Sequence, residues 1–108
     1  MEYLSTGEQL GTGYTTVLSA TTTTKNLVKS IHVTNISGDT SLYLQWYDDS
    51  KGNTLSLAHN VTIPASSSFQ VLDGTFVLDN NDYIQAKSTN LNNLDISISY
   101  LNLDNSEG

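Results

Sequence analysis

Few side chains of this chain have a type suited to chemistry, and two histidines come first among them. His32 and His59 fall in different predicted strands, and no spacing marks a third nitrogen, sulfur or oxygen ligand beside either. A zinc site needs three or four such ligands, so both are expected to be surface histidines. The chain also lacks cysteine, a nucleophile elbow, a phosphate-binding glycine loop and a His-Glu-x-x-His helix. The sequence therefore predicts no enzyme, no cofactor and no metal centre.

Two pairs of carboxylates lie in predicted turns. Asp48/Asp49 and Asp79/Asp82 have the residue type needed for acid–base work or for calcium binding. Aspartate is also common in turns because its side chain bonds to nearby backbone amides, and neither loop has the alternating ligand spacing of an EF-hand. We therefore expect turn chemistry at both places, with calcium binding as the alternative.

A third group is a candidate interaction face. Tyr43, Gln45 and Tyr47 alternate with apolar residues along one predicted strand, so they should share its outer face. Two aromatic rings beside an amide form an amphipathic patch that suits a sugar or another protein. Cross-strand pairing of tyrosines on an open sheet face would explain the same pattern without any partner. The sequence leaves both interpretations open.

Strands must position these side chains, because short segments of alternating apolar and polar residues recur along the chain. The clearest cover residues 31–35, 42–48, 69–78, 83–87 and 94–103, with turn residues between them. They predict an all-β fold, a single antiparallel β-sandwich of seven to eight short strands with an extended N-terminal arm. The residues predicted to form its core are Ile31, Val33, Leu42, Leu44, Trp46, Ile96 and Ile98.

The domain organisation is predicted to be one sandwich with two extensions. The length of 108 residues suits a single core. Residues 1–13 contain three glycines and no periodicity, so they are predicted to be an N-terminal arm ahead of the sandwich at residues 14–103. Residues 104–108 are predicted to be a polar tail. In the segment 26–35, Leu27 is expected on the same face as Ile31 and Val33, with Lys29 interrupting that face.

The charge balance excludes one class of partner. Eleven acidic residues against four lysines and no arginine give a formal net charge of −7. Binding of DNA or RNA depends on clustered cations that neutralise phosphates, so no nucleic acid is expected as a partner. No apolar run approaches the ~20 residues of a membrane span, and the first residues lack the pattern of a signal peptide. The protein is therefore predicted to be made in a cytoplasm and not secreted, with no membrane partner.

Five short motifs mark strands and turns between residues 14 and 103. They are V-K-S-I-x-V-x-N-x-S-G at 28–38, Q-W-Y-D-D-S at 45–50, I-P-A-x-S-S at 63–68, L-D-G at 72–74 and L-x-x-x-D-Y-I at 78–84. In these features the sequence resembles small β-sandwich virion proteins of tailed bacteriophages, especially those of marine and cyanobacterial phages. Such proteins serve in capsid decoration, head–tail joining or fibre attachment, and the motifs themselves carry no catalytic residue.

The resemblance implies a non-enzymatic structural protein of a virion, made in the host bacterial cytoplasm. The first expectation is a capsid decoration (cement) protein that bridges capsomers on the outer shell. Its implied partners are the major capsid protein and copies of itself, as a homo-oligomer. The arm would then contact the capsid through Leu4, Leu10 and Tyr14.

Two other roles stay open under the same resemblance. One is a carbohydrate- or receptor-binding module of a fibre or spike, which would use Tyr43, Gln45, Tyr47 and the loop at residues 48–53 to bind a host glycan. The other is a neck or tail-completion protein that forms a ring. Copy number in the virion would separate these roles, because a shell component is present in far more copies than a tail part.

Overall fold

Strands alone make up the regular structure of the residues that the structure describes. The computed structural model describes residues 2–71, 75–90 and 94–104, which contain no helix and thus none that could cross a membrane. The strands are β1 (Glu2–Gln9), β2 (Thr15–Ser19), β3 (Thr24–Asn35), β4 (Thr40–Asp48), β5 (Asn53–Ile63), β6 (Ser68–Gln70), β7 (Phe76–Leu78), β8 (Tyr83–Ser88) and β9 (Leu94–Asp104).

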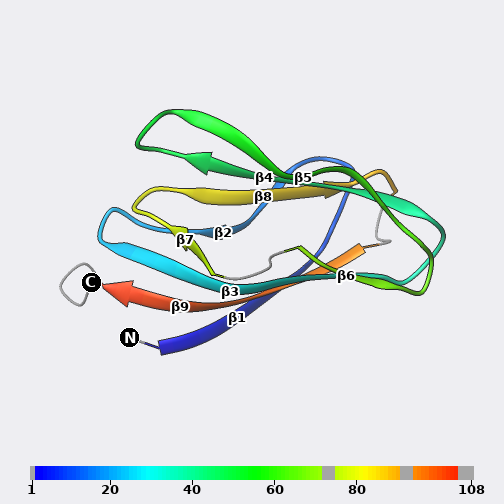
Figure 1. The fold of residues 1–108 in the computed structure, drawn as a ribbon, viewed down its shortest axis with the longest axis horizontal. Coiled ribbons are helices and arrows are strands. Elements are labelled where there is room, and N and C mark those ends of the chain that lie inside the picture. Colours follow the sequence, from blue (N-terminus) through cyan, green and yellow to red (C-terminus); the bar gives the residue numbers. More distant parts are fainter. Residues whose placement is uncertain (1, 72–74, 91–93, 105–108) are drawn as a thin grey trace.

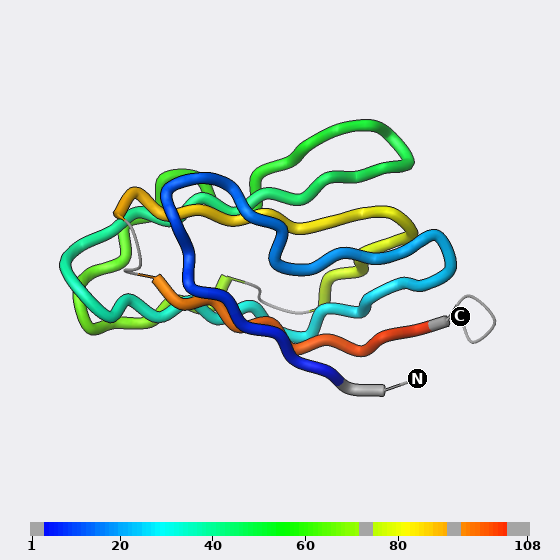
Figure 2. The backbone as a smooth tube through the Cα atoms, turned by 180° about the vertical axis from the view of Figure 1, so that it is seen from behind, coloured from blue at the N-terminus to red at the C-terminus, as the bar shows by residue number. Residues whose placement is uncertain are grey.

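The strands form two antiparallel sheets packed face to face (Figure 1). Sheet A has the order β1-β9-β3-β6, with β7 also paired to β3, and sheet B has the order β2-β8-β4-β5. Figure 2 shows the chain passing from β1 in sheet A to β2 in sheet B along one edge of the molecule. The predicted all-β antiparallel sandwich is confirmed, and the nine strands formed by the described residues are close to the predicted seven to eight.

The core lies between the inner faces of the two sheets. Alternation along β4 places Leu42 and Leu44 inward, and both are fully buried. Burying one such aliphatic side chain contributes about 1.5–3 kcal/mol, so the paired inner faces are the main source of stability. Of the residues predicted to form the core, those with a relative exposure of 2% or less are Ile31, Val33, Leu42, Leu44, Ile96 and Ile98.

A β-bulge in β3 changes which residues of that strand face the core. The pairing of β3 with β9 shifts register between Val28 and Ser30, so Lys29 is the extra residue. Val28 is fully buried and Leu27 is only half-buried, which reverses the expectation that Leu27 shares the face of Ile31. Because of this extra residue, an apolar side chain lies on the inner face on each side of the bulge. The bulge thus keeps the ammonium of Lys29 out of the core.

The first residues of the chain differ from the expected separate arm. Residues 2–9 form β1, which pairs with β9 along its whole length, from Glu2 opposite Asn102 to Gln9 opposite Asp95. The side chains of residues 4–9 are exposed or half-buried, so pairing here depends on backbone hydrogen bonds and leaves no apolar periodicity in the sequence. Leu10, expected to contact a capsid, is instead fully buried in the core, and its N–H donates to the carbonyl of Leu94 at 2.8 Å.

Trp46 lies at the margin of the core rather than inside it. Its ring is half-buried and meets Phe76 of β7 edge to face, with ring centroids 4.9 Å apart. The indole Nε1–H donates to Oδ2 of Asp82 at 3.2 Å. An indole needs a partner for its N–H, and the margin of the core is where a carboxylate can reach it.

Replacing Trp46 with phenylalanine should cost about 1–2 kcal/mol of unfolding free energy. The ring can still contact Phe76, but Asp82 loses one of its donors. Urea denaturation followed by circular dichroism measures this loss, because Trp46 is the sole tryptophan and its fluorescence disappears with it. Tyr47→Phe, on the outer face of the same strand, is the matched control and should cost less than about 0.5 kcal/mol. Equal losses in the two variants would contradict a role for the indole N–H.

Three sequence features fall wholly or partly outside the described residues. Of the predicted polar tail, residues 105–108 lie outside, and residue 104 ends β9. The motif at 72–74 and part of the turn between β8 and β9, residues 91–93, also lie outside them.

Candidate functional site

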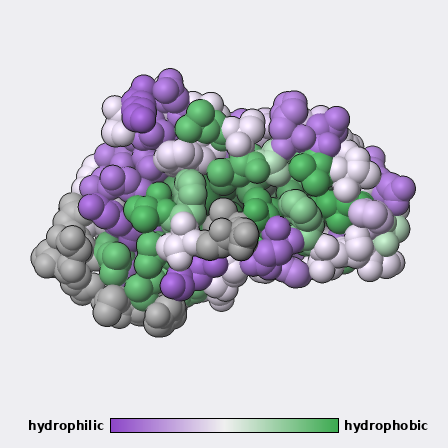
Figure 3. Space-filling model, in the orientation of Figure 1, coloured by the Kyte–Doolittle hydropathy of each residue, from purple (hydrophilic) through white to green (hydrophobic). Residues whose placement is uncertain are grey.

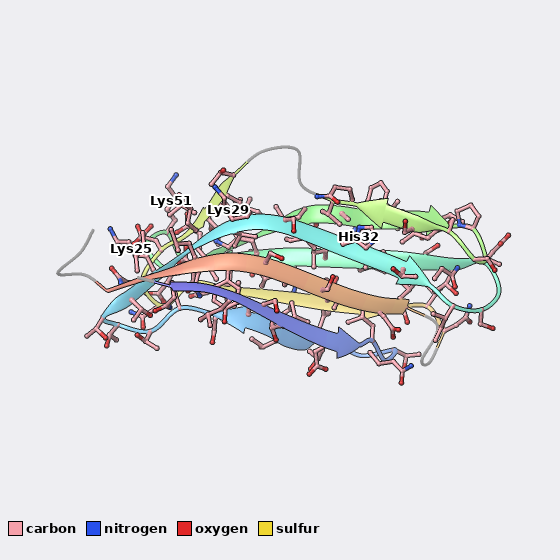
Figure 4. All side chains as sticks on the ribbon, turned by 90° about the horizontal axis from the view of Figure 1, so that it is seen from below. Lys25, Lys29, His32 and Lys51 are labelled. Carbon is pink, nitrogen blue, oxygen red and sulfur yellow. The ribbon has the colours of Figure 1, made fainter. Side chains whose placement is uncertain are left out.

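The two histidines occupy different sheets. His32 lies on β3, where its Nδ1 is 3.4 Å from Oε1 of Gln70 on the neighbouring β6. His59 lies on β5 in sheet B, with its ring edge-on to Tyr43 and the ring centroids 5.2 Å apart. Figure 4 shows His32 on the sheet A side, on the same strand as Lys25 and Lys29. The described residues contain no group of three or more His, Cys, Asp or Glu side chains arranged to share a metal ion.

The first carboxylate pair engages its own turn. Asp48 is 8% exposed, and its Oδ1 accepts a hydrogen bond from Oγ of Ser50 at 2.8 Å. The N–H of Lys51 donates to the carbonyl of Asp48 at 3.3 Å, and Gly52 follows with a φ of 65°. A left-handed φ favours glycine, so this is the tight connection between β4 and β5 that the composition predicts.

The second carboxylate pair includes the most enclosed acid of the described chain. Asp82 is 2% exposed, and its Oδ2 accepts from Nε1 of Trp46 and from the N–H of Asp79, at 3.2 and 3.1 Å. Its Oδ1 accepts from the N–H of Asp49 at 2.9 Å. One carboxylate thus joins the β4–β5 turn to the β7–β8 turn. Because both of its oxygens are occupied, it is a structural residue rather than an accessible acid or base.

The predicted interaction residues do share the outer face of sheet B. Tyr43, Gln45 and Tyr47 alternate with the inward residues of β4 and are half-buried. Their partners on β8 are Lys87, Gln85 and Tyr83, one opposite each. We use the name "aromatic face" for these six side chains together with two neighbours that contact them: Tyr14, Tyr43, Gln45, Tyr47, His59, Tyr83, Gln85 and Lys87.

Every rung of the aromatic face is a direct side-chain pair. Tyr47 and Tyr83 stack with an interplanar angle of 20° and ring centroids 4.9 Å apart. In the middle rung, Nε2 of Gln45 donates to Oε1 of Gln85 at 2.9 Å. Such cross-strand pairs stabilise an antiparallel sheet by roughly 0.2–1 kcal/mol each.

The last rung of the aromatic face brings a cation between two phenol rings. Nζ of Lys87 lies 4.9 Å from the ring centroid of Tyr43 and 4.8 Å from that of Tyr14. His59 from β5 contacts the same Tyr43 ring at its edge. The part of the chain that the structure describes contains no pocket, so the aromatic face is an open surface.

The fold is similar to part of a virus protein. No family model matches the sequence, and no curated protein matches it. Among solved structures, the chain superposes on a chain of infectious bursal disease virus strain Gx with a TM-score of 0.53 and 12% identity, covering 94% of this chain and 29% of that one. For strain Gt the TM-score is 0.50 at 12% identity, covering 99% of this chain and 32% of that one. This chain therefore spans about a third of either virus chain, and at such identity the likeness concerns the fold alone.

A band of apolar side chains lies along one edge of the sandwich (Figure 3). At this edge β5 borders sheet B, and β6 borders sheet A. Leu55 of β5 is 45% exposed. We call the band the apolar edge; the half-buried residues beside Leu55 that pack against the core here are Leu57, Val61, Phe69, Val71 and Phe76. Exposed apolar patches of this kind often mark contacts with other proteins.

The three residues expected to form a capsid-contact arm do not lie together. Leu4 is 37% exposed on β1, at the border of sheet A, and Leu10 is in the core. Tyr14 is 40% exposed and belongs to the aromatic face, through its contact with Lys87. The sequence pattern missed this grouping because Tyr14 and Lys87 are brought together by the pairing of β2 with β8.

The three residues that β8 contributes to the aromatic face were also missed in the sequence analysis. Tyr83, Gln85 and Lys87 alternate with Ile84 and Ala86, the same pattern that marks β4. That alternation predicts that these three side chains of β8 point outward from the sheet. Only the antiparallel register places each member opposite a particular residue of β4.

Proposed function

We propose that this protein is a non-enzymatic structural component of a virus particle, and that its role is decoration of the outer surface of the shell. The observation that carries the proposal is the likeness of nearly the whole sandwich to part of a chain of a virus particle. Its partners would be the major capsid protein and further copies of the chain. The sequence resemblance to phage virion proteins supports the same role.

The surface chemistry of the described chain supports a binding role over a catalytic one. The carboxylate of Asp48 accepts a hydrogen bond within its own turn, that of Asp82 accepts from the β4–β5 and β7–β8 turns, and no described cluster of side chains is arranged for a metal. The net charge of −7 keeps the protein away from packaged nucleic acid and suits the outside of a shell.

The apolar edge is the surface that we assign to contact with the shell. It runs between the two border strands, where Leu55 is exposed and Phe69 and Phe76 are half-buried. Side chains of this type form the centre of stable protein interfaces, whereas charged residues are depleted there. Covering the apolar edge would also shield the unpaired backbone of β5, which otherwise invites uncontrolled strand pairing.

Copy number in purified virions tests the decoration role. We expect the protein in a fixed ratio to the major capsid protein, at hundreds of copies per particle, because a decoration protein follows the symmetry of the shell. Quantitative mass spectrometry against the major capsid protein measures this ratio. A few to a few dozen copies would contradict decoration and would favour a neck, tail or fibre position.

A charge placed in the apolar edge should lower occupancy on the particle. Leu55→Asp introduces a carboxylate where an apolar contact is expected, so the copy number should fall at least tenfold. Ile36→Asp is the matched control, since Ile36 is 53% exposed in the β3–β4 turn and is not one of the residues that define the apolar edge. Circular dichroism checks that both variants fold. Equal occupancy of the two variants would exclude the apolar edge as the contact surface.

A further inference from the structure

The outer face of sheet B differs in composition from the outer face of sheet A. Four of the six tyrosines of the chain lie on the aromatic face, on or beside β8 and β4. On sheet A, one outer row is formed by small hydroxyl residues, with Ser30 opposite Ser99 and Ser5 opposite Ser99 on its other side, and another is aliphatic, with Leu27 opposite Leu101 and Val77. The two sheets have the same strand geometry, so pairing within a sheet does not by itself require tyrosines on one side only.

The middle of the aromatic face offers unused hydrogen-bonding groups. Each glutamine amide has one carbonyl oxygen and two N–H donors. The bond from Gln45 Nε2 to Gln85 Oε1 uses one donor and one acceptor, which leaves the carbonyl of Gln45 and the amide N–H groups of Gln85. A neighbouring acceptor and donor, flanked by tyrosine rings on both sides, fit the alternating hydroxyl and C–H surfaces of a sugar.

One end of the aromatic face carries positive charge on a strongly acidic protein. Lys87 has its ammonium between Tyr14 and Tyr43, and among the described residues no carboxylate forms an ion pair with it. Lys25 differs in this respect, because its Nζ lies 3.8 Å from Oδ1 of Asp79. His59 contacts the same Tyr43 ring and adds a second nitrogen donor. An ammonium held at a ring face in a chain of net charge −7 is complementary to an anionic group of a ligand.

We propose that the aromatic face binds a carboxylated oligosaccharide. The tyrosine rings contact the C–H faces of the sugars, Gln45 and Gln85 bond to their hydroxyls, and Lys87 pairs with a carboxylate. From Tyr43 to Tyr47 the strand advances about 13 Å, so the site accommodates several sugar units laid along β4. A second copy of this chain docked through the same face is a poorer occupant, since the aromatic face contains no carboxylate that could pair with Lys87 of that copy.

Titration with a linear tetramer of galacturonic acid tests the proposal. Amide chemical shifts of the ¹⁵N-labelled protein should move at β4 and β8 and not on sheet A. The carboxyl-reduced tetramer, which has the same linkage without charge, should bind about tenfold more weakly, because a hydrogen bond to a charged group is lost. Added salt should weaken binding of the acidic tetramer, since the pair is close to solvent.

Charge-matched variants assign the effect to Lys87. Lys87→Gln should weaken binding of the acidic tetramer about tenfold and abolish its preference over the reduced tetramer, whereas Lys87→Arg should keep both. Lys29→Gln removes the same charge from sheet A, where Lys29 is exposed (Figure 4), and should leave the affinity unchanged. Chemical shifts without ligand show that each variant is folded.

Three results would overturn the proposal. The first is no shift of the β4 and β8 amides at millimolar acidic tetramer. The second is equal affinity for the acidic and reduced tetramers, or equal effects of Lys87→Gln and Lys29→Gln. The third is a concentration-dependent change at the aromatic face without any sugar, which would identify the face as an interface between copies of the chain.

Discussion

Removal of residues 1–13 is expected to unfold the sandwich or to destabilise it by at least about 3 kcal/mol. Leu10 is fully buried in the core, and losing a leucine from such a site costs about 2–5 kcal/mol by itself. The deletion also removes β1, which pairs with β9 over eight residues. The exposed edge of β9 should then make the truncated protein prone to aggregation.

Urea denaturation of the full and truncated chains measures this effect, with light scattering as the check on aggregation. Two point variants separate its causes. Leu10→Ala should cost about 2–5 kcal/mol, whereas Leu4→Ala, the same change at a residue that is 37% exposed, should cost less than about 1 kcal/mol. If the truncated chain stayed within about 1 kcal/mol of the full chain, residues 1–13 would be a dispensable arm, as the sequence suggested.

Asp82→Ala is expected to lower the free energy of unfolding by about 2–4 kcal/mol. The carboxylate is 2% exposed and accepts hydrogen bonds from Trp46, Asp49 and Asp79. Its removal leaves three donors without their partner at a site with little access for water, and each unsatisfied buried group costs about 1–3 kcal/mol. The two turns that Asp82 joins would also lose their mutual constraint.

Asp49→Ala is the matched control for this second prediction. Asp49 is exposed in the adjacent turn, and the bond to Asp82 uses its backbone N–H, which the substitution keeps. Its cost should be below about 0.5 kcal/mol in the same urea experiment. Asp82→Asn keeps the shape of the side chain and two acceptor positions on one oxygen. Its cost in unfolding free energy should therefore lie between the costs of Asp82→Ala and Asp49→Ala. A loss under about 1 kcal/mol for Asp82→Ala would mean that water replaces the carboxylate.

Much of the sandwich follows from local pattern. The alternation in residues 42–48 and 94–103 predicts β4 and β9, and the inward residues Leu42, Leu44, Ile96 and Ile98 are buried as expected from it. Alternation has this power because successive side chains of a strand point to opposite faces, so one buried face leaves a visible period of two.

Three features of the structure differ from the prediction for the same reason: each has a cause that a local pattern does not contain. β1 is held by backbone pairing and has few buried side chains, so nothing in its residue types distinguishes it from an arm. The bulge at Lys29 shifts the period by one residue and moves Val28, not Leu27, to the core. Trp46 moves to the margin because Asp82 and Phe76, more than 25 residues away in the sequence, are its partners.

The sequence by itself determined the strand content, the acidic surface and the outward placement of Tyr43, Gln45 and Tyr47. These depend on composition and on neighbours one or two residues apart. Only the tertiary structure decided that Lys87 lies between Tyr14 and Tyr43, that Gln85 bonds to Gln45, and that Asp82 joins two turns. Those contacts depend on strand order and register, which result from packing the whole core at once and not from any single segment.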